Sequence, residues 1–263
     1  MPNLKRLNHY LPVCYQRGFA NSAGQVWVRF SDKPKPEPRK PTTVGFKRSF
    51  YIIEENGGET DRVEDFFNKT VETPFARLSR RISEQQDELS TISGFELGVL
   101  ARFVASQAVR TAAHKKCVEE QARSPVSSTV FVRVMARLSW TILNNWINSN
   151  PNFHFYTSLP HVADRFITGD HPVVVMVQNE NMVWQPRDDP QRAIRKLEDI
   201  LNDPGYAFHL PLSPYIAVCI HGKGGRCALP PRQVDPLEVR ALNDKIRGQS
   251  EFFTLARDPE SLT

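Results

Sequence analysis

Residues 94–121 read GFELGVLARFVASQAVRTAAHKKCVEEQ, and this stretch decides how the middle of the chain folds. Its apolar residues recur at spacings of three and four, as on one face of an amphipathic helix. The pattern predicts a single long helix over residues 94–121. Its core-facing stripe begins with Leu97, Leu100, Phe103 and Val104.

Helices are also predicted on both sides of this segment. Residues 61–82 carry an apolar stripe at the same spacing, and Pro74 is expected to kink or divide that helix. The other helix, over residues 124–146, begins with Ser124-Pro125, a good cap and first-turn pair. Apolar side chains are spread widely around it, so we expect it to be buried on more than one side.

Segments that are typical of strands lie before and after these helices. They are rich in β-branched and aromatic residues and are bounded by turns. The predicted strands cover residues 25–30, 49–53, 153–157, 165–168, 172–177, 215–220 and 252–255. The other predicted elements are a short helix within residues 8–19 and two polar helices over residues 190–201 and 236–248.

This order of elements predicts an α+β fold rather than a doubly wound sheet. We expect a central helical bundle packed on a mixed or antiparallel sheet built from N-terminal and C-terminal strands. Residues 1–263 are expected to form a single domain. The four prolines of residues 33–41 predict an extended connection on the surface.

The composition is that of an ordinary globular protein with an excess of basic residues. Apolar residues make up 40% of the chain, charged residues 24%, and the net charge is +5. That charge permits contact with nucleic acid, a nucleotide or another polyanion, although acids accompany the bases along the helices. No run of about 18 apolar residues occurs, so no membrane span is expected. Four scattered cysteines favour a reduced, cytoplasmic location.

Three polar residues interrupt the core-facing stripe of residues 94–121. Gln107 lies at its centre, Arg110 at its edge and His114 near its middle. Burying an unpaired amide costs on the order of 1–3 kcal/mol, and an unpaired charge costs more. These side chains therefore line a pocket, where Arg110 binds an anionic group, or form an internal network. In the network, Gln107 and Arg110 bond to loop carbonyls or to a carboxylate such as Asp170.

Two residues elsewhere have the chemistry for acid–base catalysis. His9 has a side chain that titrates near working pH, but it also suits a role as a hydrogen-bonded anchor of the N-terminal turn. Asp170 follows a predicted strand, a position where loops often carry function. The alternative for Asp170 is an Asx-type turn in which it caps its own backbone before Pro172.

No metal site and no particular cofactor is predicted. Cys219-x-His221-x5-Cys227 has ligand types for zinc, but its spacing matches no compact zinc knuckle. Cys219 lies on an apolar strand, where a buried free thiol is the usual explanation. Phosphate-loop, dinucleotide and Gly-x-Ser-x-Gly motifs are absent from the sequence.

Short motifs follow one another along nearly the whole chain. They are His9-Tyr-Leu-Pro12, Tyr15-x-Arg17-Gly-Phe19, Gln25-Val-Trp27, Pro41-x-x-Val44-Gly45, Phe103-Val-Ala-Ser-Gln107-x-x-Arg110-Thr111, Phe166-Ile-Thr-Gly-Asp170-His-Pro172 and Leu210-Pro-Leu-Ser-Pro214. In this order they resemble the bacterial "domain of unknown function 4238" family, which has no established reaction. The resemblance implies a shared site built around the histidine, glutamine, arginine and aspartate of the motifs. We therefore place His9, Arg110 and Asp170 as candidate catalytic residues, and Tyr10, Arg17 and Gln107 as candidate substrate-binding residues.

Two classes of function follow from these candidates. The first is a nuclease-like effector that processes a phosphodiester or nucleotide, with Arg17 and Arg110 on phosphate and His9 with Asp170 as the acid–base pair. A role in bacterial defence is an analogy only. The alternative is a non-catalytic binding or regulatory module for an anionic ligand or a partner protein, in which Gln107 and Arg110 recognise the ligand. A purely structural network of these polar residues is the third interpretation.

Overall fold

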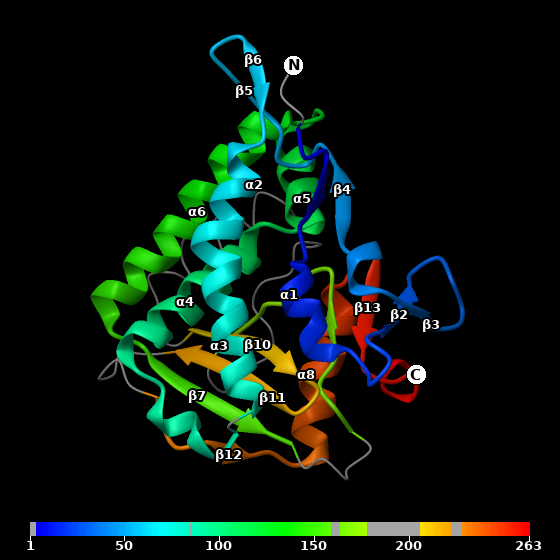
Figure 1. Cartoon of the computed structure of the whole chain (residues 1–263), viewed down its shortest axis with the longest axis vertical. Helices are drawn as coiled ribbons and strands as arrows, with labels where there is room; N and C mark the ends of the chain where they lie inside the picture. Colours follow the sequence, from blue (N-terminus) through cyan, green and yellow to red (C-terminus); the bar gives the residue numbers. More distant parts are fainter. Residues whose placement is uncertain (1–3, 85, 159–163, 178–205, 222–227) are drawn as a thin grey trace.

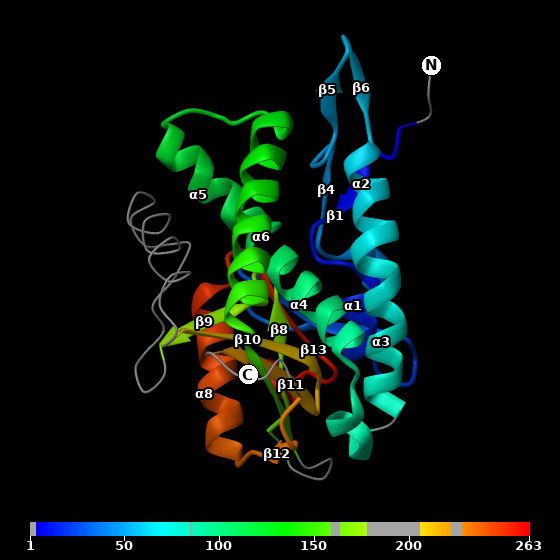
Figure 2. The same ribbon diagram turned by 90° about the vertical axis from the view of Figure 1, so that its left-hand side faces the viewer.

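A computed structural model describes residues 4–84, 86–158, 164–177, 206–221 and 228–263. It confirms the α+β fold: long helices stand on one side, and two larger sheets lie beneath and beside them (Figure 1). The helix predicted over residues 190–201 lies outside the described residues. Figure 2 shows α4 (Gly94–Val109) between α3 (Thr73–Glu84) and α6 (Ser128–Ser149), and α4 packs on both.

The helix predicted over residues 61–82 is present and changes pitch in the middle. It consists of α2 (Arg62–Phe67), the π-helical turn η3 (Asn68–Glu72) and α3. Pro74 cannot donate a backbone hydrogen bond and crowds the preceding turn, and the wider π turn lies directly before it. The Phe66 carbonyl accepts a 2.6 Å hydrogen bond from the Thr70 hydroxyl within this segment.

The prediction of one helix over residues 94–121 is wrong. The chain breaks after α4 at Arg110, and α5 (Ala112–Ala122) begins with Thr111 as its cap. The Thr111 hydroxyl accepts the backbone N–H of His114 at 3.1 Å. The threonine hydroxyl thus takes the place of the backbone carbonyl that would accept this N–H in a continuous helix. A new helix therefore begins at this point, although the apolar pattern runs on without a break.

Five strands form the larger sheet, in the order β12-β7-β11-β10-β9. All neighbours are antiparallel except β12 and β7, which are parallel. The strands are β7 (Asn152–Thr157), β9 (Val174–Val177), β10 (Tyr206–Ser213), β11 (Ile216–His221) and β12 (Arg232–Gln233). The main core lies between this sheet and the helices, and α8 (Pro236–Gln249) packs over a second, smaller apolar cluster.

The second sheet joins the two ends of the chain, in the order β3-β2-β13-β8. Its strands are β2 (Val26–Phe30), β3 (Glu37–Arg39), β8 (Thr168–Gly169) and β13 (Phe253–Ala256). N-terminal and C-terminal strands therefore do share a sheet, as expected. That sheet is separate from the five-stranded one, so the prediction of a single sheet is corrected to two larger sheets.

Two small antiparallel pairs complete the described strands. They are β1 (Leu7–His9) with β4 (Phe46–Arg48), and β5 (Ile53–Glu55) with β6 (Gly58–Thr60). The strand predicted over residues 49–53 is not formed: residues 49–51 are a turn, in which Ser49 has a φ of 55°, and Ile53 is the first residue of β5. The short helix predicted within residues 8–19 is confirmed only as α1 (Val13–Gln16) and the 3-10 turn η1 (Arg17–Phe19).

Helix α6 is buried along one face, and three of its other apolar residues are exposed. Its buried residues are Phe131, Met135, Leu138, Ile142 and Trp146. Trp140, by contrast, is 65% exposed, and Val130 and Ile147 are also exposed. The expectation that this helix is buried on more than one side is therefore wrong, because no described segment packs over that second stripe.

Gly45 occupies a position that no other residue fits. Its φ is +68°, and an added Cβ would lie 2.7 Å from the Cβ of Leu11. We expect Gly45→Ala to cost about 1–2 kcal/mol for the left-handed backbone and a further 1–3 kcal/mol, roughly, for the clash. Gly24 is the matched control, because its φ is +70° and nothing lies within 4 Å of its added Cβ. Urea denaturation of both variants should show the larger loss at Gly45, and equal losses would contradict the steric argument.

Candidate functional site

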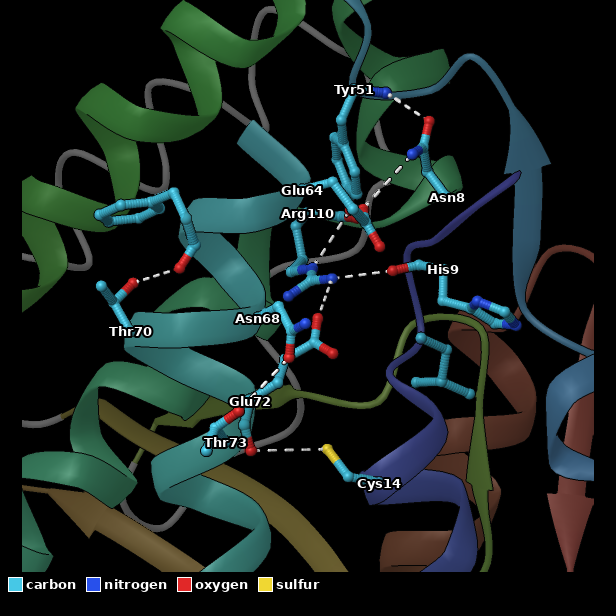
Figure 3. Close-up of polar contacts among 12 residues, drawn as sticks. Asn8, His9, Cys14, Tyr51, Glu64, Asn68, Thr70, Glu72, Thr73 and Arg110 are labelled. Atoms are coloured by element: carbon cyan, nitrogen blue, oxygen red, sulfur yellow. Dashed lines mark hydrogen bonds and ion pairs between the residues drawn. The ribbon is translucent and has the colours of Figure 1, made fainter. Parts of the chain in front are cut away.

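Arg110 is the centre of a buried polar network that joins four parts of the chain (Figure 3). Its Nη2 donates to the Glu72 carboxylate and to the His9 carbonyl, each at 2.8 Å. Its Nε donates to the Tyr51 hydroxyl at 3.1 Å, and that hydroxyl donates to the Arg110 carbonyl at 3.2 Å. We call Arg110, Glu72, Tyr51, Asn8 and Glu64 the Arg110 network.

The guanidinium is sealed from solvent in this position. Arg110 is 0% exposed, and its guanidinium carbon lies 4.2 Å from the centre of the Phe67 ring. The Nη1 atom has no hydrogen-bond partner within the described part of the chain. A buried charge is tolerated because Glu72 neutralises it and the aromatic face offers a further favourable contact.

Asn8 and Glu64 extend the network towards the N-terminal segment. The Asn8 amide donates to the Lys5 carbonyl at 2.9 Å and to Glu64 at 3.4 Å, and its oxygen accepts the backbone N–H of Tyr51. Burial raises the pKa of Glu64 to about 7, although the nearby Arg110 charge opposes that rise. Small changes around the Arg110 network can therefore change the protonation state of Glu64 near neutral pH.

Asp170 lies in a separate buried position. Its carboxylate accepts the backbone N–H groups of Glu251 and Phe252 at 3.0 and 3.1 Å, so it organises the loop before β13. It also follows β8, as predicted. Burial raises its pKa to about 7, and the backbone hydrogen bonds partly offset that effect. The Asx-type turn is not what is observed, because these donors come from a distant segment.

The raised pKa of Asp170 predicts a pH dependence of stability. The folded protein holds a proton between about pH 4 and pH 7 that the unfolded chain releases, so this contribution is present at low pH and lost as pH rises. Asp170→Asn removes this titration. The stability of the variant relative to wild type should therefore increase with pH, by up to about 1.4 kcal/mol per unit. Urea denaturation from pH 5 to pH 8 measures it, and a constant difference would contradict the assignment.

The six candidate residues do not converge on one site. His9 reaches Arg110 through its carbonyl, while its ring points away and lies 3.2 Å from the Thr42 carbonyl (Figure 3). Burial lowers the pKa of His9. Tyr10 is buried and packs against Phe50, with Asp170 as an electrostatic neighbour. Arg17 is exposed in η1 and forms no hydrogen bond or ion pair with the described residues.

Gln107 and His114 lie in the protein interior rather than on a pocket floor. Gln107 is 0% exposed, and neither amide atom has a hydrogen-bond partner among the described residues. His114 belongs to α5 and not to the same helix as Gln107. Burial lowers the pKa of His114 to about 4. Arg110 and Glu72 therefore realise the predicted internal network, with Glu72 in the place expected for Asp170.

An open groove, missed by the sequence analysis, lies between α2, η3, α4 and α6. Its main part encloses about 650 Å³ and continues into a smaller hollow that shares Arg102, Trp140 and Leu143. Its walls carry Phe66 and Trp140, which are 56% and 65% exposed. We call this surface the apolar groove. The other residues that line its main part are Ile53, Glu55, Arg62, Val63, Phe67, Thr70, Val71, Ser106, Val132, Met135, Ala136 and Ser139.

Phe67 connects the apolar groove to the Arg110 network. The ring lines the groove and also stacks on the Arg110 guanidinium. Glu72 and Thr70 belong to the same π turn, and Arg102 reaches the Thr70 carbonyl at 3.4 Å. The buried ion pair thus fixes the α2–η3 wall of the groove.

The fold and its surfaces define an α+β protein with a sealed arginine–glutamate centre beneath an open apolar groove. Residues 8–129 match the family described as "Protein of unknown function (DUF4238)", the family that the motifs of the sequence resemble. Every residue of the Arg110 network falls within the matched segment. No curated protein and no solved structure matches the chain.

Among the described residues, no helix is long and apolar enough to cross a membrane. No group of three or more His, Cys, Asp or Glu side chains among them is arranged to hold a metal ion. Cys219 lies 3.6 Å from His209 Nε2, and Cys227 falls outside the described residues.

Proposed function

We propose that this protein is a non-catalytic binding module that takes up an amphipathic, acidic helix of a partner protein in the apolar groove. The observation that carries the proposal is the pair of exposed aromatic walls, Phe66 and Trp140, along an open hollow of about 650 Å³. Contiguous exposed apolar surface with a polar rim is typical of interaction sites.

The dimensions of the groove favour a helix over an isolated acyl chain. Its α6 wall runs from Val132 to Ile147, a length of roughly 22 Å at 1.5 Å per residue. A partner helix of about four turns matches that length and presents apolar residues at three-and-four spacing. A bound helix would also cover Phe66 and Trp140 at the rims of the groove. A single acyl chain at the bottom of the groove would leave these two side chains exposed to water.

Charge on the groove selects an acidic partner. Arg62 and Glu55 form an ion pair at one end, so they largely neutralise each other. Arg102 lines both the main part and the smaller hollow, and no acidic side chain among the described residues pairs with it. An aspartate or glutamate on the partner helix would meet Arg102, mainly adding specificity and a faster association rate.

Selection from a peptide library tests the proposal. A displayed library of helix-forming peptides about 18 residues long spans about 27 Å and suits the groove. We expect enriched sequences to carry apolar residues at helical spacing and a net negative charge. Enriched sequences without that pattern, or no enrichment, would contradict the proposal.

The phosphodiester-processing role predicted from the sequence has less support from the geometry. Arg110 is occupied by Glu72 and the His9 carbonyl, and Arg17 stands on the surface in a different segment. The phosphodiester-processing role is tested by assaying hydrolysis of RNA, DNA and nucleotides in the presence of Mg²⁺ or Mn²⁺. Cleavage by the wild type that His9→Ala abolishes would favour the enzyme over the binding module.

A further inference from the structure

A second hollow, separate from the apolar groove, lies where the four-stranded sheet meets α8. It encloses about 510 Å³ and is lined by the end of β2, the following turn, β13 and α8. Three cationic side chains line it, Arg29, Lys33 and Arg247, against the single acid Asp32. We call this surface the basic pocket. None of its residues lines the apolar groove.

Both arginines are held in place by the C-terminal turn η5 (Glu260–Leu262). Arg29 Nη1 donates to the Leu262 carbonyl at 2.8 Å, and Arg247 Nη2 donates to the Ser261 carbonyl at 2.9 Å. Side chains that are already ordered lose little conformational entropy when a ligand binds. The pocket therefore presents two fixed guanidinium groups rather than two free surface chains.

Each arginine retains donors that the protein does not use. The Nε atom of Arg247 is buried and has no hydrogen-bond partner within the described residues. Arg29 has no acidic partner among the described residues, whereas Lys33 pairs with Glu37 and Arg247 Nη1 pairs with the exposed Asp244. A buried donor without a partner is costly, so an acceptor oxygen at this position is favoured.

The remaining walls combine hydroxyl groups with an aromatic surface. Ser31 and the largely buried Thr254 contribute hydroxyls. Phe30 and Phe253 meet edge to face, with ring centres 6.1 Å apart, and provide an apolar wall. Guanidinium forks and hydroxyls suit a phosphate group, and the aromatic wall suits a flat ring.

We infer that the basic pocket binds a small organic phosphate monoester that carries a flat ring. Its volume falls in the range of small-molecule sites, which is larger than one phosphate ion requires. The phosphate lies between Arg29 and Arg247, and the ring rests against Phe30. This site is independent of the helix-binding role proposed for the apolar groove.

Calorimetric titration with adenosine monophosphate, ribose 5-phosphate and inorganic phosphate tests the inference. We expect adenosine monophosphate to bind wild type most tightly, because it alone has both the phosphate and the ring. Arg29 and Lys33 are exposed, so both can be replaced. Arg29→Gln should weaken the binding of adenosine monophosphate by about tenfold, and Lys33→Gln should weaken it severalfold. Arg133→Gln on α6 removes the same charge outside the pocket and should leave the affinity within twofold.

The outcomes separate the possibilities clearly. Absence of adenosine monophosphate binding to wild type would overturn the inference, as would equal weakening by Arg29→Gln and Arg133→Gln. Equal affinity for all three phosphates would overturn the role given to Phe30. Because Arg29 and Arg247 both bond to η5, their variants are read alongside their thermal stability, and Lys33→Gln, which removes no bond to η5, is the independent check.

Discussion

Arg110→Met is expected to lower the free energy of unfolding by about 3–5 kcal/mol, the largest loss of any single change considered for this chain. Removing the guanidinium leaves the Glu72 carboxylate without its cationic partner and the His9 carbonyl without a donor. The Tyr51 hydroxyl loses one bond as well. Urea denaturation followed by circular dichroism measures the loss.

A double-mutant cycle separates the ion pair from simple packing. Glu72→Gln alone should also destabilise, because it leaves the fully buried Arg110 guanidinium without its neutralising carboxylate, although the glutamine carbonyl can still accept from Nη2. Arg110→Met combined with Glu72→Gln should be more stable than the sum of the two single losses predicts, since no unpaired charge remains. Strictly additive losses would show that Arg110 contributes only volume, and would contradict the network described above.

Trp140→Glu is expected to weaken binding of a selected acidic helix by about 30-fold, as for a central hot-spot aromatic. The change removes the largest exposed apolar side chain of the groove and places a negative charge opposite an acidic partner. Because Trp140 is 65% exposed, its replacement should leave the thermal stability nearly unchanged. Fluorescence anisotropy of the labelled peptide gives the dissociation constant.

Trp140→Phe is the matched control for this variant. It keeps an aromatic wall, so binding should weaken by no more than severalfold. Phe95→Glu tests specificity, because Phe95 is also highly exposed but lines neither part of the groove. If Phe95→Glu and Trp140→Glu weaken binding equally, the peptide binds through general hydrophobic attraction and the groove assignment fails.

Helix positions could be predicted from the sequence where apolar periodicity is the dominant signal. Residues 61–82 and 236–248 came close to the observed helices because one face of each meets the core. The break at Thr111 could not be seen in this way. Its cause is a local competition, in which the threonine hydroxyl takes the N–H of His114 while the apolar pattern runs on.

The candidate site was predictable only in part, because partners far apart in the sequence are set by the tertiary fold. Gln107 and Arg110 on an apolar stripe did indicate a buried network or a pocket, and the network is what Arg110 forms. Its acid partner Glu72 lies 38 residues away on a π turn, a feature that periodicity does not reveal. Part of the second apolar stripe of α6 lines the groove, although an apolar stripe by itself predicts a buried face.

Reversing the charge of Arg102 tests whether the apolar groove selects an acidic helix. Wild type and Arg102→Glu are each titrated with a selected acidic helix and with the same helix carrying lysine in place of its acids. We predict that wild type prefers the acidic peptide and that Arg102→Glu prefers the basic one, with both preferences reduced by high salt. Unchanged preference in the Arg102→Glu variant would contradict the proposal that the apolar groove binds an acidic helix.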